Sequence, residues 1–421
     1  MVRELKHTEI GDIPVDWELQ TFDETFRVLS NNTLSRENLN NRGGAIRNIH
    51  YGDILTKFPE VLDCSIEEIP YINDFSLLSL STQLLQDGDI VIADTAEDET
   101  VGKVTEVQNL GDGKLVPGLH TIPCRVKKGD FAPGWLGYYL NSYLFHRQVL
   151  PFVTGIKVSS ISKTSISETI IAIPPYDEQR EIVAALLEID KCIKRLEKEI
   201  AKKRNTQYGI MEKYLTGKKR LDGFESDWVE TTLGQITDIK DGTHQTPHYV
   251  EDGIPFYSVE TVTTDDFQHV KKISLEEHKK LTFSYKIEKG DVLMTRIGTL
   301  GKCKFVDWDV DASFYVSLAL LKFRGNTDLA RFVAYLSELK MFIKEVDLHS
   351  LQYAIPMKIN LGAMEEIRVR VPSDIEEIRA INNVFFDLVQ NLSFIEMKKH
   401  KLSQIKLGMM RDLLTGKIRL V

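Results

Sequence analysis

The sequence has few cysteines, no long apolar run and no export signal, and each absence excludes a class of protein. The four cysteines among 421 residues stand alone, without the spacing of a disulfide framework or a metal site: Cys64, Cys124, Cys192 and Cys303. No stretch approaches the roughly 18 consecutive apolar residues of a membrane span, and the first residues lack the pattern of a signal peptide. The sequence therefore predicts a cytoplasmic protein with no membrane partner.

Motifs that carry catalysis are missing as well. The chain has no Gly-x-x-x-x-Gly-Lys-Ser/Thr phosphate-binding loop, and its ten histidines form no cluster with the spacing of metal ligands. Asp94, Glu97 and Glu99 precede Lys103 and have the side chains of a nuclease metal site, but their spacing is poor for one. We expect no catalytic residue, no cofactor-binding residue and no metal-binding residue in this chain.

An excess of positive charge is missing too. The chain has 53 lysines and arginines against 62 aspartates and glutamates, a net charge of −9, which disfavours a nucleic-acid partner. The charge is unevenly distributed, because residues 176–221 and 374–421 are net positive whereas the blocks before each of them are net negative. Two interpretations stay open: solvated helix surfaces, or a local stripe that faces phosphate groups.

The chain repeats itself at long range. Residues 209–221 return as residues 408–420, identical at eight of thirteen positions at an offset of 199. A period of that length is too long for a solenoid and predicts one half-molecule built twice. We therefore expect two related sites.

An apolar seam with alternating spacings of four and three predicts a long helix of coiled-coil type before the end of each repeat. The first seam comprises Ile182, Leu186, Ile189, Ile193, Leu196 and Ile200, and the second comprises Ile381, Phe385, Leu388, Leu392, Ile395 and Leu402. Pro175 precedes the first helix, a Ser373–Glu376 capping box is expected for the second, and Gly217 and Gly416 are natural stops. Because an exposed seam is unfavourable, the two helices are expected to bury each other.

The blocks before the helices have the short apolar runs of strands, with helical patterns near residues 135–149 and 329–346. We predict an α+β fold with four segments: mixed α/β domains at 1–174 and 222–372, and repeated helices at 175–221 and 373–421. Asp16-Trp17 matches Asp227-Trp228, yet the loops between such landmarks hardly match. A shared frame with different loops is expected of two readers of two different targets.

These features together resemble the specificity subunit of type I restriction-modification systems. The resemblance rests on Ile-Pro-Pro-Tyr-Asp-Glu-Gln-Arg-Glu-Ile at 173–182, on Leu-Thr-Gly-Lys at 215–218 and 414–417, and on the opening residues 8–17. Residues 48–53 and 241–247 also look like stretches of that family's target-recognition domains. Each motif is weak alone, and their order and duplication along the whole chain make the resemblance specific.

The resemblance implies two target-recognition domains separated by two long antiparallel coiled-coil helices, related by a pseudo-two-fold internal repeat. It implies a DNA-recognition subunit that binds a bipartite asymmetric duplex site and directs adenine methylation and restriction by partner chains. The implied partners are double-stranded DNA, type I methyltransferase subunits, expected to number two, and restriction/translocase subunits. The implied cofactors, S-adenosylmethionine, ATP and Mg²⁺, would belong to the partners.

Polar side chains in the variable loops are the candidates for DNA contacts, because they can reach base edges or phosphates from turns. The first domain offers Asn31, Asn32, Ser35, Arg36, Arg47, Asn48, His50, Tyr51, Lys157, Ser159, Ser160 and Lys163. The second offers Thr243, His244, Gln245, Thr246, His248, Arg296, Thr299, Gln352, Tyr353 and Lys358. The groups are more specific indicators than their single members.

Two alternatives belong to other classes. The chain could be a non-catalytic coiled-coil adaptor whose end domains bind protein rather than DNA. It could also be an enzyme, but Ile173 stands where the Asn-Pro-Pro-Tyr motif of adenine methyltransferases has an amide, and no glycine-rich loop for a methyl donor accompanies it. We therefore expect no enzymatic activity from the chain by itself. Sequence-specific binding with a stable methyltransferase partner would exclude the adaptor.

Overall fold

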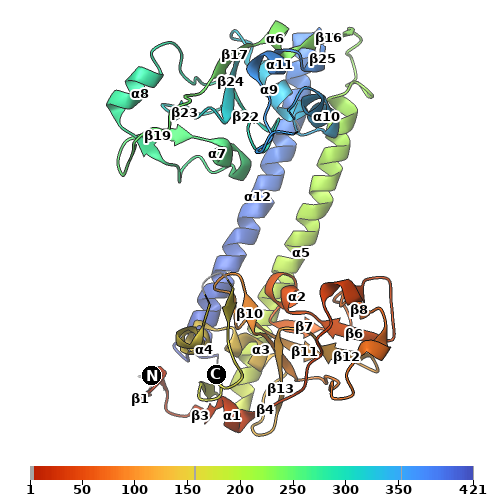
Figure 1. Cartoon of the computed structure of the whole chain (residues 1–421), viewed down its shortest axis with the longest axis vertical. Helices are drawn as coiled ribbons and strands as arrows, with labels where there is room; N and C mark the ends of the chain where they lie inside the picture. The colour runs from red at the N-terminus through yellow and green to blue at the C-terminus, as the bar shows by residue number, and fades with distance from the viewer. Residues whose placement is uncertain (1–3, 156–157, 352, 421) are drawn as a thin grey trace. The chain divides into compact units, whose positions relative to one another are not determined.

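The computed structural model describes residues 4–155, 158–351 and 353–420, and the chain divides into two compact units. Unit 1 consists of residues 1–196 and 398–421, and unit 2 of residues 197–397. The long helices α5 (Tyr176–Tyr214) and α12 (Ile375–Leu413), both labelled in Figure 1, are each divided between the two units. The first long helix, expected between Pro175 and the stop at Gly217, is confirmed.

Unit 1 contains the first mixed domain. Its strands are β1 (Leu5–Thr8), β2 (Gly11–Pro14), β3 (Glu18–Thr21), β4 (Phe26–Val28), β5 (Leu39–Asn40), β6 (Ile46–Ile49), β7 (Val61–Asp63), β8 (Tyr71–Ile72), β9 (Ile90–Ala93), β10 (Thr95–Ala96), β11 (Val104–Gln108), β12 (Lys114–Pro117), β13 (Thr121–Val126), β14 (Ser159–Ser160) and β15 (Ile170–Ile173). Its shorter helices are α1 (Phe22–Thr25), η1 (Arg36–Asn38), α2 (Tyr51–Thr56), η2 (Phe75–Leu77), α3 (Trp135–Leu140), α4 (Tyr143–Val149) and η3 (Leu150–Phe152).

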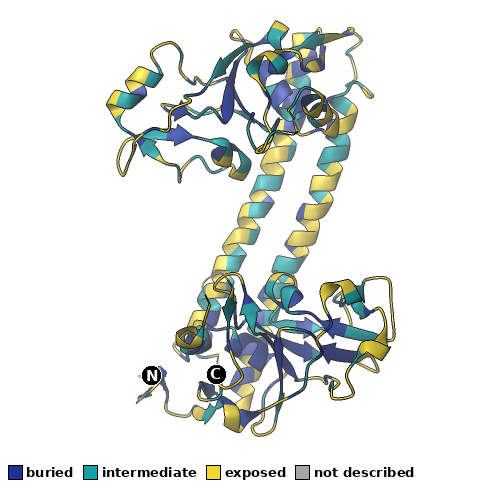
Figure 2. Ribbon diagram, in the orientation of Figure 1, coloured by how far each residue is buried: buried dark blue, intermediate teal, exposed yellow. Residues whose placement is uncertain are grey.

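The main sheet of unit 1 has the strand order β4-β13-β9-β11-β7, and a second sheet has the order β12-β6-β8-β5. Strand β9 is buried along its whole length, as its unbroken apolar run predicts for a central strand. Trp17 and Trp135 meet edge to face in the core, with ring centroids 6.3 Å apart. Figure 2 shows this buried sheet beside largely exposed stretches of the long helices.

Unit 2 contains the second mixed domain. Its strands are β16 (Trp228–Thr232), β17 (Asp238–Asp241), β18 (Tyr249–Val250), β19 (Ile254–Tyr257), β20 (Lys272–Ile273), β21 (Val292–Thr295), β22 (Cys303–Phe305), β23 (Ser313–Phe314), β24 (Leu318–Lys322) and β25 (Arg368–Pro372). Its shorter helices are α6 (Leu233–Ile236), α7 (Val259–Thr264), α8 (Leu275–Leu281), α9 (Thr327–Leu336), α10 (Lys340–Leu348) and α11 (Leu361–Glu365). The main sheet has the order β17-β24-β21-β22, and the smaller one the order β18-β20-β19-β23.

The two main sheets share one plan. The order β4-β13-β9-β11 of unit 1 returns as β17-β24-β21-β22 in unit 2. The aspartate of the Gly-Asp pair before the central strand makes the same contact in both units. The Asp89 carboxylate accepts a hydrogen bond from the Gln86 N–H at 2.7 Å, and the Asp291 carboxylate accepts one from the Glu288 N–H at 2.8 Å. Each carboxylate thereby closes the turn that leads into β9 or β21.

The repeated Leu-Thr-Gly-Lys motif ends each long helix against a tryptophan. Gly217 has φ +70° and Gly416 has φ +69°, which favour glycine after a helix. A Cβ on Gly217 would lie 3.1 Å from the Trp228 ring, and one on Gly416 would lie 3.2 Å from the Trp17 ring. Both motif glycines thus end a helix close to a tryptophan ring, and at Gly416 the ring of Pro14 is closer still.

The arginine that follows each motif binds the buried glutamate near the start of the other long helix. Arg419 donates to Glu178 and Asp16 within unit 1, and Arg220 donates to Glu377 within unit 2. Both glutamate side chains are fully buried, so each needs its arginine as counter-charge. These ion pairs tie the end of one helix to the start of the other in each unit.

The seam residues are distributed over both units. In unit 1 the early part of α5 packs against the late part of α12, and in unit 2 the late part of α5 lies beside an earlier part of α12, which is antiparallel pairing. The seam residues Ile182, Leu186, Ile189, Leu196, Ile200, Ile381, Phe385 and Ile395 are buried, whereas Ile193, Leu388, Leu392 and Leu402 are half-buried. Seam residues are thus buried both against the domains and, at Leu196, Ile200 and Ile395, along the middle of the helices.

Local structure corrects two expectations. The cap of α12 is Asp374, whose Oδ1 accepts the Glu376 N–H at 2.9 Å, rather than the expected Ser373–Glu376 box. Each expected helical stretch is also broken into two helices. The Asn141 side chain bonds the Val104 backbone at the end of α3, and Ser142 then caps α4. Of the helices in the described ranges, none is long and apolar enough to cross a membrane.

Candidate nucleic-acid interface

In unit 1, part of the first candidate group gathers around the start of α2. The His50 and Tyr51 ring centroids are 4.7 Å apart, and Tyr51 meets the edge of His120 at 5.3 Å. Arg36 forms a two-point ion pair with Asp53 at 2.9 and 2.7 Å. The surface around α2 thus combines aromatic rings with a fixed guanidinium, side chains that can contact bases and phosphates.

Other members of that group are turned inward. Asn32 and Asn48 are buried and bonded to each other at 2.7 Å, and Asn31 donates to the Thr121 carbonyl at 2.9 Å. Arg47 donates to the Cys64 carbonyl at 2.7 Å. All four side chains hold loops together; Asn32 and Asn48 are buried, whereas Asn31 and Arg47 are half-buried. Ser35, by contrast, is exposed and bonds Asn38 at 3.1 Å.

The second group of unit 1 lies beside the first. Strand β14, which contains Ser159 and Ser160, pairs antiparallel with β10, and both serines are half-buried. Lys163 is exposed, and Lys157 lies outside the described residues. Because β10 directly follows Asp94, this strand pair joins the 159–163 segment to the end of the central strand.

The acid Asp241 holds the candidate surface of unit 2 together. Its carboxylate pairs with Arg296 and lies 2.9 Å from His244 Nε2. Tyr285 donates its hydroxyl proton to the Asp241 carbonyl at 2.6 Å. Arg296 is buried and also donates to the Ile359 carbonyl at 3.3 Å. Arg296 therefore fixes two loops, rather than projecting from the surface.

The remaining candidates of unit 2 come from three loops that the backbone brings together. Thr243 and Tyr315 form an isolated backbone β-bridge, and Ile297 and Lys358 form another. Gly298 N–H donates to the Met357 carbonyl at 2.8 Å. The exposed members are His244, Gln245, Thr246, His248, Thr299, Tyr353 and Lys358, with Tyr353 fully exposed, and Gln352 lies outside the described residues. The loops near residues 241–248, 296–299 and 353–358 thus lie together and present polar side chains beside the exposed apolar side chains of Ile355 and Met357.

Sequence patterns missed the residues at the centre of each surface. Asp94 and His120 in unit 1, and Asp241 and Tyr315 in unit 2, link the predicted groups. Asp241 opens the stretch 241–247 that carried the family resemblance, which was a usable signal. His120 has φ +56°, a strained conformation for a histidine. The residues next to it in the sequence do not predict its place at this surface.

Charge is tuned by burial at these surfaces. Burial lowers the pKa of His50, and nearby Arg36 lowers it further. Its Nδ1 accepts the Gly52 N–H at 3.1 Å, an interaction that requires this nitrogen to be unprotonated. His50 is therefore held neutral as the cap of α2, while His120 beside it remains half-exposed.

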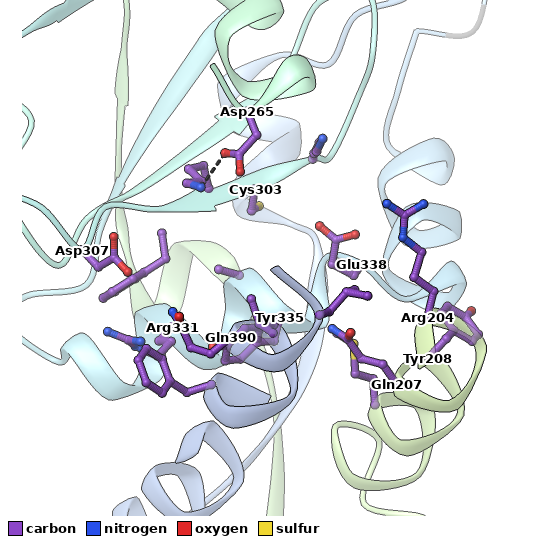
Figure 3. Close-up of a pocket in the computed structure, with 18 of the residues that line it drawn as sticks. Arg204, Gln207, Tyr208, Asp265, Cys303, Asp307, Arg331, Tyr335, Glu338 and Gln390 are labelled. Carbon is purple, nitrogen blue, oxygen red and sulfur yellow. Dashed lines mark hydrogen bonds and ion pairs between the residues drawn. The ribbon is translucent and has the colours of Figure 1, made fainter. Parts of the chain in front are cut away.

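A cleft of about 490 Å³ lies in unit 2 between the domain and the long helices. Figure 3 shows Gln207 and Tyr208 of α5 on one side, and Cys303 and Asp265 on the other. Burial raises the pKa of Glu338, which also lines the cleft. Arg331 lies over the Phe305 ring at 4.5 Å and near Phe386 at 5.7 Å. The lining mixes aromatic and charged groups.

Among the residues that the structure describes, no group of three or more histidines, cysteines or carboxylates could hold a metal ion. Lys103, expected near the acids of the 94–99 turn, instead donates to the Leu55 carbonyl at 3.2 Å. The candidate surfaces present hydrogen-bond donors and acceptors on converging loops.

Comparison with known proteins gives a consistent result. The model of the type I restriction modification DNA specificity domain matches residues 14–203 and 225–407. The chain is 24% identical to the putative type I restriction enzyme MjaX specificity subunit of Methanocaldococcus jannaschii, over 98% of this chain and 96% of that relative. It is also 24% identical to the EcoBI specificity subunit of Escherichia coli, over 47% of this chain and 44% of that one.

Solved structures show the same fold. The type I restriction-modification S subunit from M. genitalium superposes with a TM-score of 0.56 at 16% identity, over 98% of this chain and 99% of that one. A chain from a structural study of assembly and conformational transition of the type I R-M system gives a TM-score of 0.56 at 15% identity, over 96% of this chain and 99% of its own.

Proposed function

The chain belongs to the type I restriction modification DNA specificity domain family, and from this premise we propose that it recognises a bipartite, asymmetric duplex sequence. One observation carries the proposal. The two units share the order of their main sheets, yet the loops beyond the central strands present different side chains. Two similar frames with different polar surfaces suit two unlike half-sites, since base edges are read by side-chain donors and acceptors.

The chain works without catalysis of its own in this proposal. Methyltransferase subunits, two in number, transfer the methyl group to adenine, and restriction/translocase subunits cut the DNA. S-adenosylmethionine, ATP and Mg²⁺ are bound by those partners. Exposed apolar side chains on the unit 2 part of α12, namely Phe386, Val389, Phe394 and Met397, support a protein partner on that helix.

The net charge of −9 bears on how DNA is held. Phosphate contacts by lysine and arginine provide much of the affinity of most DNA-binding proteins. An acidic chain alone is therefore expected to bind weakly, with its partners contributing much of the positive surface. Recognition and affinity are in this way divided between subunits.

Exchange of one domain tests the proposal. Residues 222–372 are replaced by the matching segment of a relative, the chain is co-expressed with its partner subunits, and the methylated motif is determined by sequencing modified DNA. One half of the motif should change while the other half stays. The matched exchange of residues 1–174 should change the opposite half.

Two results would contradict modular reading. A change in both halves after a single exchange, or in neither, means that the domains do not read independently. A complex without any sequence-specific methylation would instead favour the protein-binding adaptor.

A further inference from the structure

Asp94 lies where the two candidate groups of unit 1 meet. It directly follows the central strand β9. Its N–H donates to the His120 carbonyl at 3.1 Å, and the Ile161 N–H donates to the Asp94 carbonyl at 2.9 Å. The backbone thus fixes Asp94 between the turn that carries His120 and the 159–163 segment.

Arg296 holds the equivalent place in unit 2. It directly follows β21, its N–H donates to the Ser317 carbonyl at 2.9 Å, and the Ile359 N–H donates to its carbonyl at 3.0 Å. The same two backbone bonds therefore present an acid in unit 1 and a base in unit 2. Since Arg296 is buried and paired with Asp241, unit 2 neutralises its charge internally.

The carboxylate of Asp94 has only part of its capacity to accept hydrogen bonds filled within the chain. Its Oδ1 accepts the Thr95 hydroxyl at 2.7 Å, and His120 Nδ1 lies 3.5 Å from the same oxygen. The Asp94 side chain keeps 25% of its surface exposed. In the described ranges no donor is bonded to Oδ2. Asp94 therefore offers an oriented, accessible acceptor.

A partly exposed carboxylate at a DNA interface is repelled by phosphates, so its favourable partner is a donor on a base. In the major groove the exocyclic amino groups, N4 of cytosine and N6 of adenine, are such donors. We propose, resting on the proposed function, that Asp94 is a specificity-determining residue of unit 1 that accepts a hydrogen bond from a base amino group. Thr95 and His120 are its positioning residues.

Asp94→Asn tests the assignment in the complete complex with partner subunits. The amide keeps the shape but can donate a hydrogen bond as well as accept one, so it no longer selects strictly for an amino group. We expect one base pair to relax, in the half-site that also changes when residues 1–174 are exchanged, and its cytosine or adenine supplies the amino group. Discrimination at that position should fall roughly 5- to 150-fold. Glu97→Gln is the matched control, because it removes the same charge from the same exposed turn.

Duplexes with one modified base separate the two amino groups. At the relaxed position, 2-pyrimidinone replaces cytosine or purine replaces adenine, which removes the amino group alone. Wild-type binding should weaken with one of these substitutions, and the Asp94→Asn complex should be insensitive to it. Asp94→Ala is a second variant that keeps the test valid should Asn destabilise the turn, and thermal unfolding checks the fold of each.

Several outcomes would overturn the assignment. An unchanged motif, a relaxed base pair at which wild-type binding is insensitive to removal of the amino group, or an equal gain in affinity for all sequences in both Asp94→Asn and Glu97→Gln would each do so. Such results leave bipartite recognition intact, because the wild-type motif still has two halves. Failure of the proposed function is distinguishable, since the wild-type complex would then have no motif.

Discussion

The two units join their domain to the long helices in different ways. In unit 1, Lys406 Nζ lies 2.8 Å from Glu60 Oε2 and 2.8 Å from Asp190 Oδ1, and Tyr138 donates to Asp190 Oδ2 at 2.6 Å. All four side chains come from separate segments of the chain, so the ion cluster fastens the domain to both helices. Burial raises the pKa of Asp190, whereas Lys406 lowers it.

In unit 2 the positions equivalent to the lysine and the aspartate of that cluster carry uncharged side chains. At the offset of 199, Gln207 stands for Lys406 and Val389 stands for Asp190. Both line the cleft, together with Tyr335, which takes the place of Tyr138. The tyrosines correspond because Trp135 and Phe332, three residues before each, lie edge-on to Trp17 and Trp228.

The difference teaches which contacts the duplicated frame requires. The contacts that end the long helices, glycine against tryptophan and arginine with glutamate, occur in both units. The junction between domain and helices is ionic in one unit and an open, partly apolar cleft in the other. The contacts at the ends of the long helices are therefore common to both units. The side chains at the junction between domain and helices, and those on the candidate loops, differ between the units.

Replacing Lys406, the cation of the ion cluster in unit 1, should have the largest effect on stability. Lys406→Met leaves the partly buried carboxylates of Glu60 and Asp190 without their counter-charge. Breaking a buried ion pair from one side costs several kcal/mol, so we expect about 3 kcal/mol of lost stability. Chemical denaturation of the full chain, followed by circular dichroism, measures it.

The matched control is Gln207→Met, the same replacement at the equivalent position of unit 2. That side chain is half-buried beside the cleft and is not part of an ion cluster. Its replacement should change stability by no more than about 0.5 kcal/mol. Equal losses in both variants would mean that the ion cluster is not what distinguishes the junctions.

Sequence patterns predicted what depends on local or repeated chemistry. The seams, the helix ends at Gly217 and Gly416 and the shared frame are readable because glycine, proline and apolar spacing act on their immediate neighbours. Which polar loop residues face outward was not readable. Asn48 and Arg296 are of the same residue types as side chains that contact bases from a surface. Only their tertiary contacts, with Asn32 and Asp241 respectively, show that they are buried.

The His50 cap should make unit 1, but not the corresponding helix of unit 2, sensitive to pH. Burial lowers the pKa of His50, with Arg36 and His120 adding to the shift and Asp53 opposing it. A histidine with a folded pKa below its unfolded value of about 6.5 stabilises the fold above that pH and loses this contribution as pH falls. Loss of the Gly52 cap should cost about 1 kcal/mol.

His50→Asn is the variant that isolates this effect, since an amide oxygen caps a helix without titrating here. Stability of wild type and variant should agree at pH 7.5 and diverge towards pH 5.5, where only the wild type declines. In unit 2 the residue before α7 is Ser258, which has no charge to gain. A decline of the same size in the variant would assign the pH dependence to other groups.

Phosphate contacts should be the feature in which the two units behave alike. Lys163 in unit 1 and Lys358 in unit 2 are exposed on the candidate surfaces, and each can neutralise one phosphate. Replacing either by alanine in the complete complex should lower affinity equally for all sequences and leave the methylated motif unchanged. Each loss should reduce the slope of log affinity against log salt by about 0.9, which is about a threefold to fourfold effect between 50 and 200 mM salt. Lys191→Ala, on an exposed helix face beside Glu188, should leave that slope unchanged. An altered motif in either surface variant would make that lysine a base reader, and would show that the units differ in their positive charges as well as at Asp94 and Arg296.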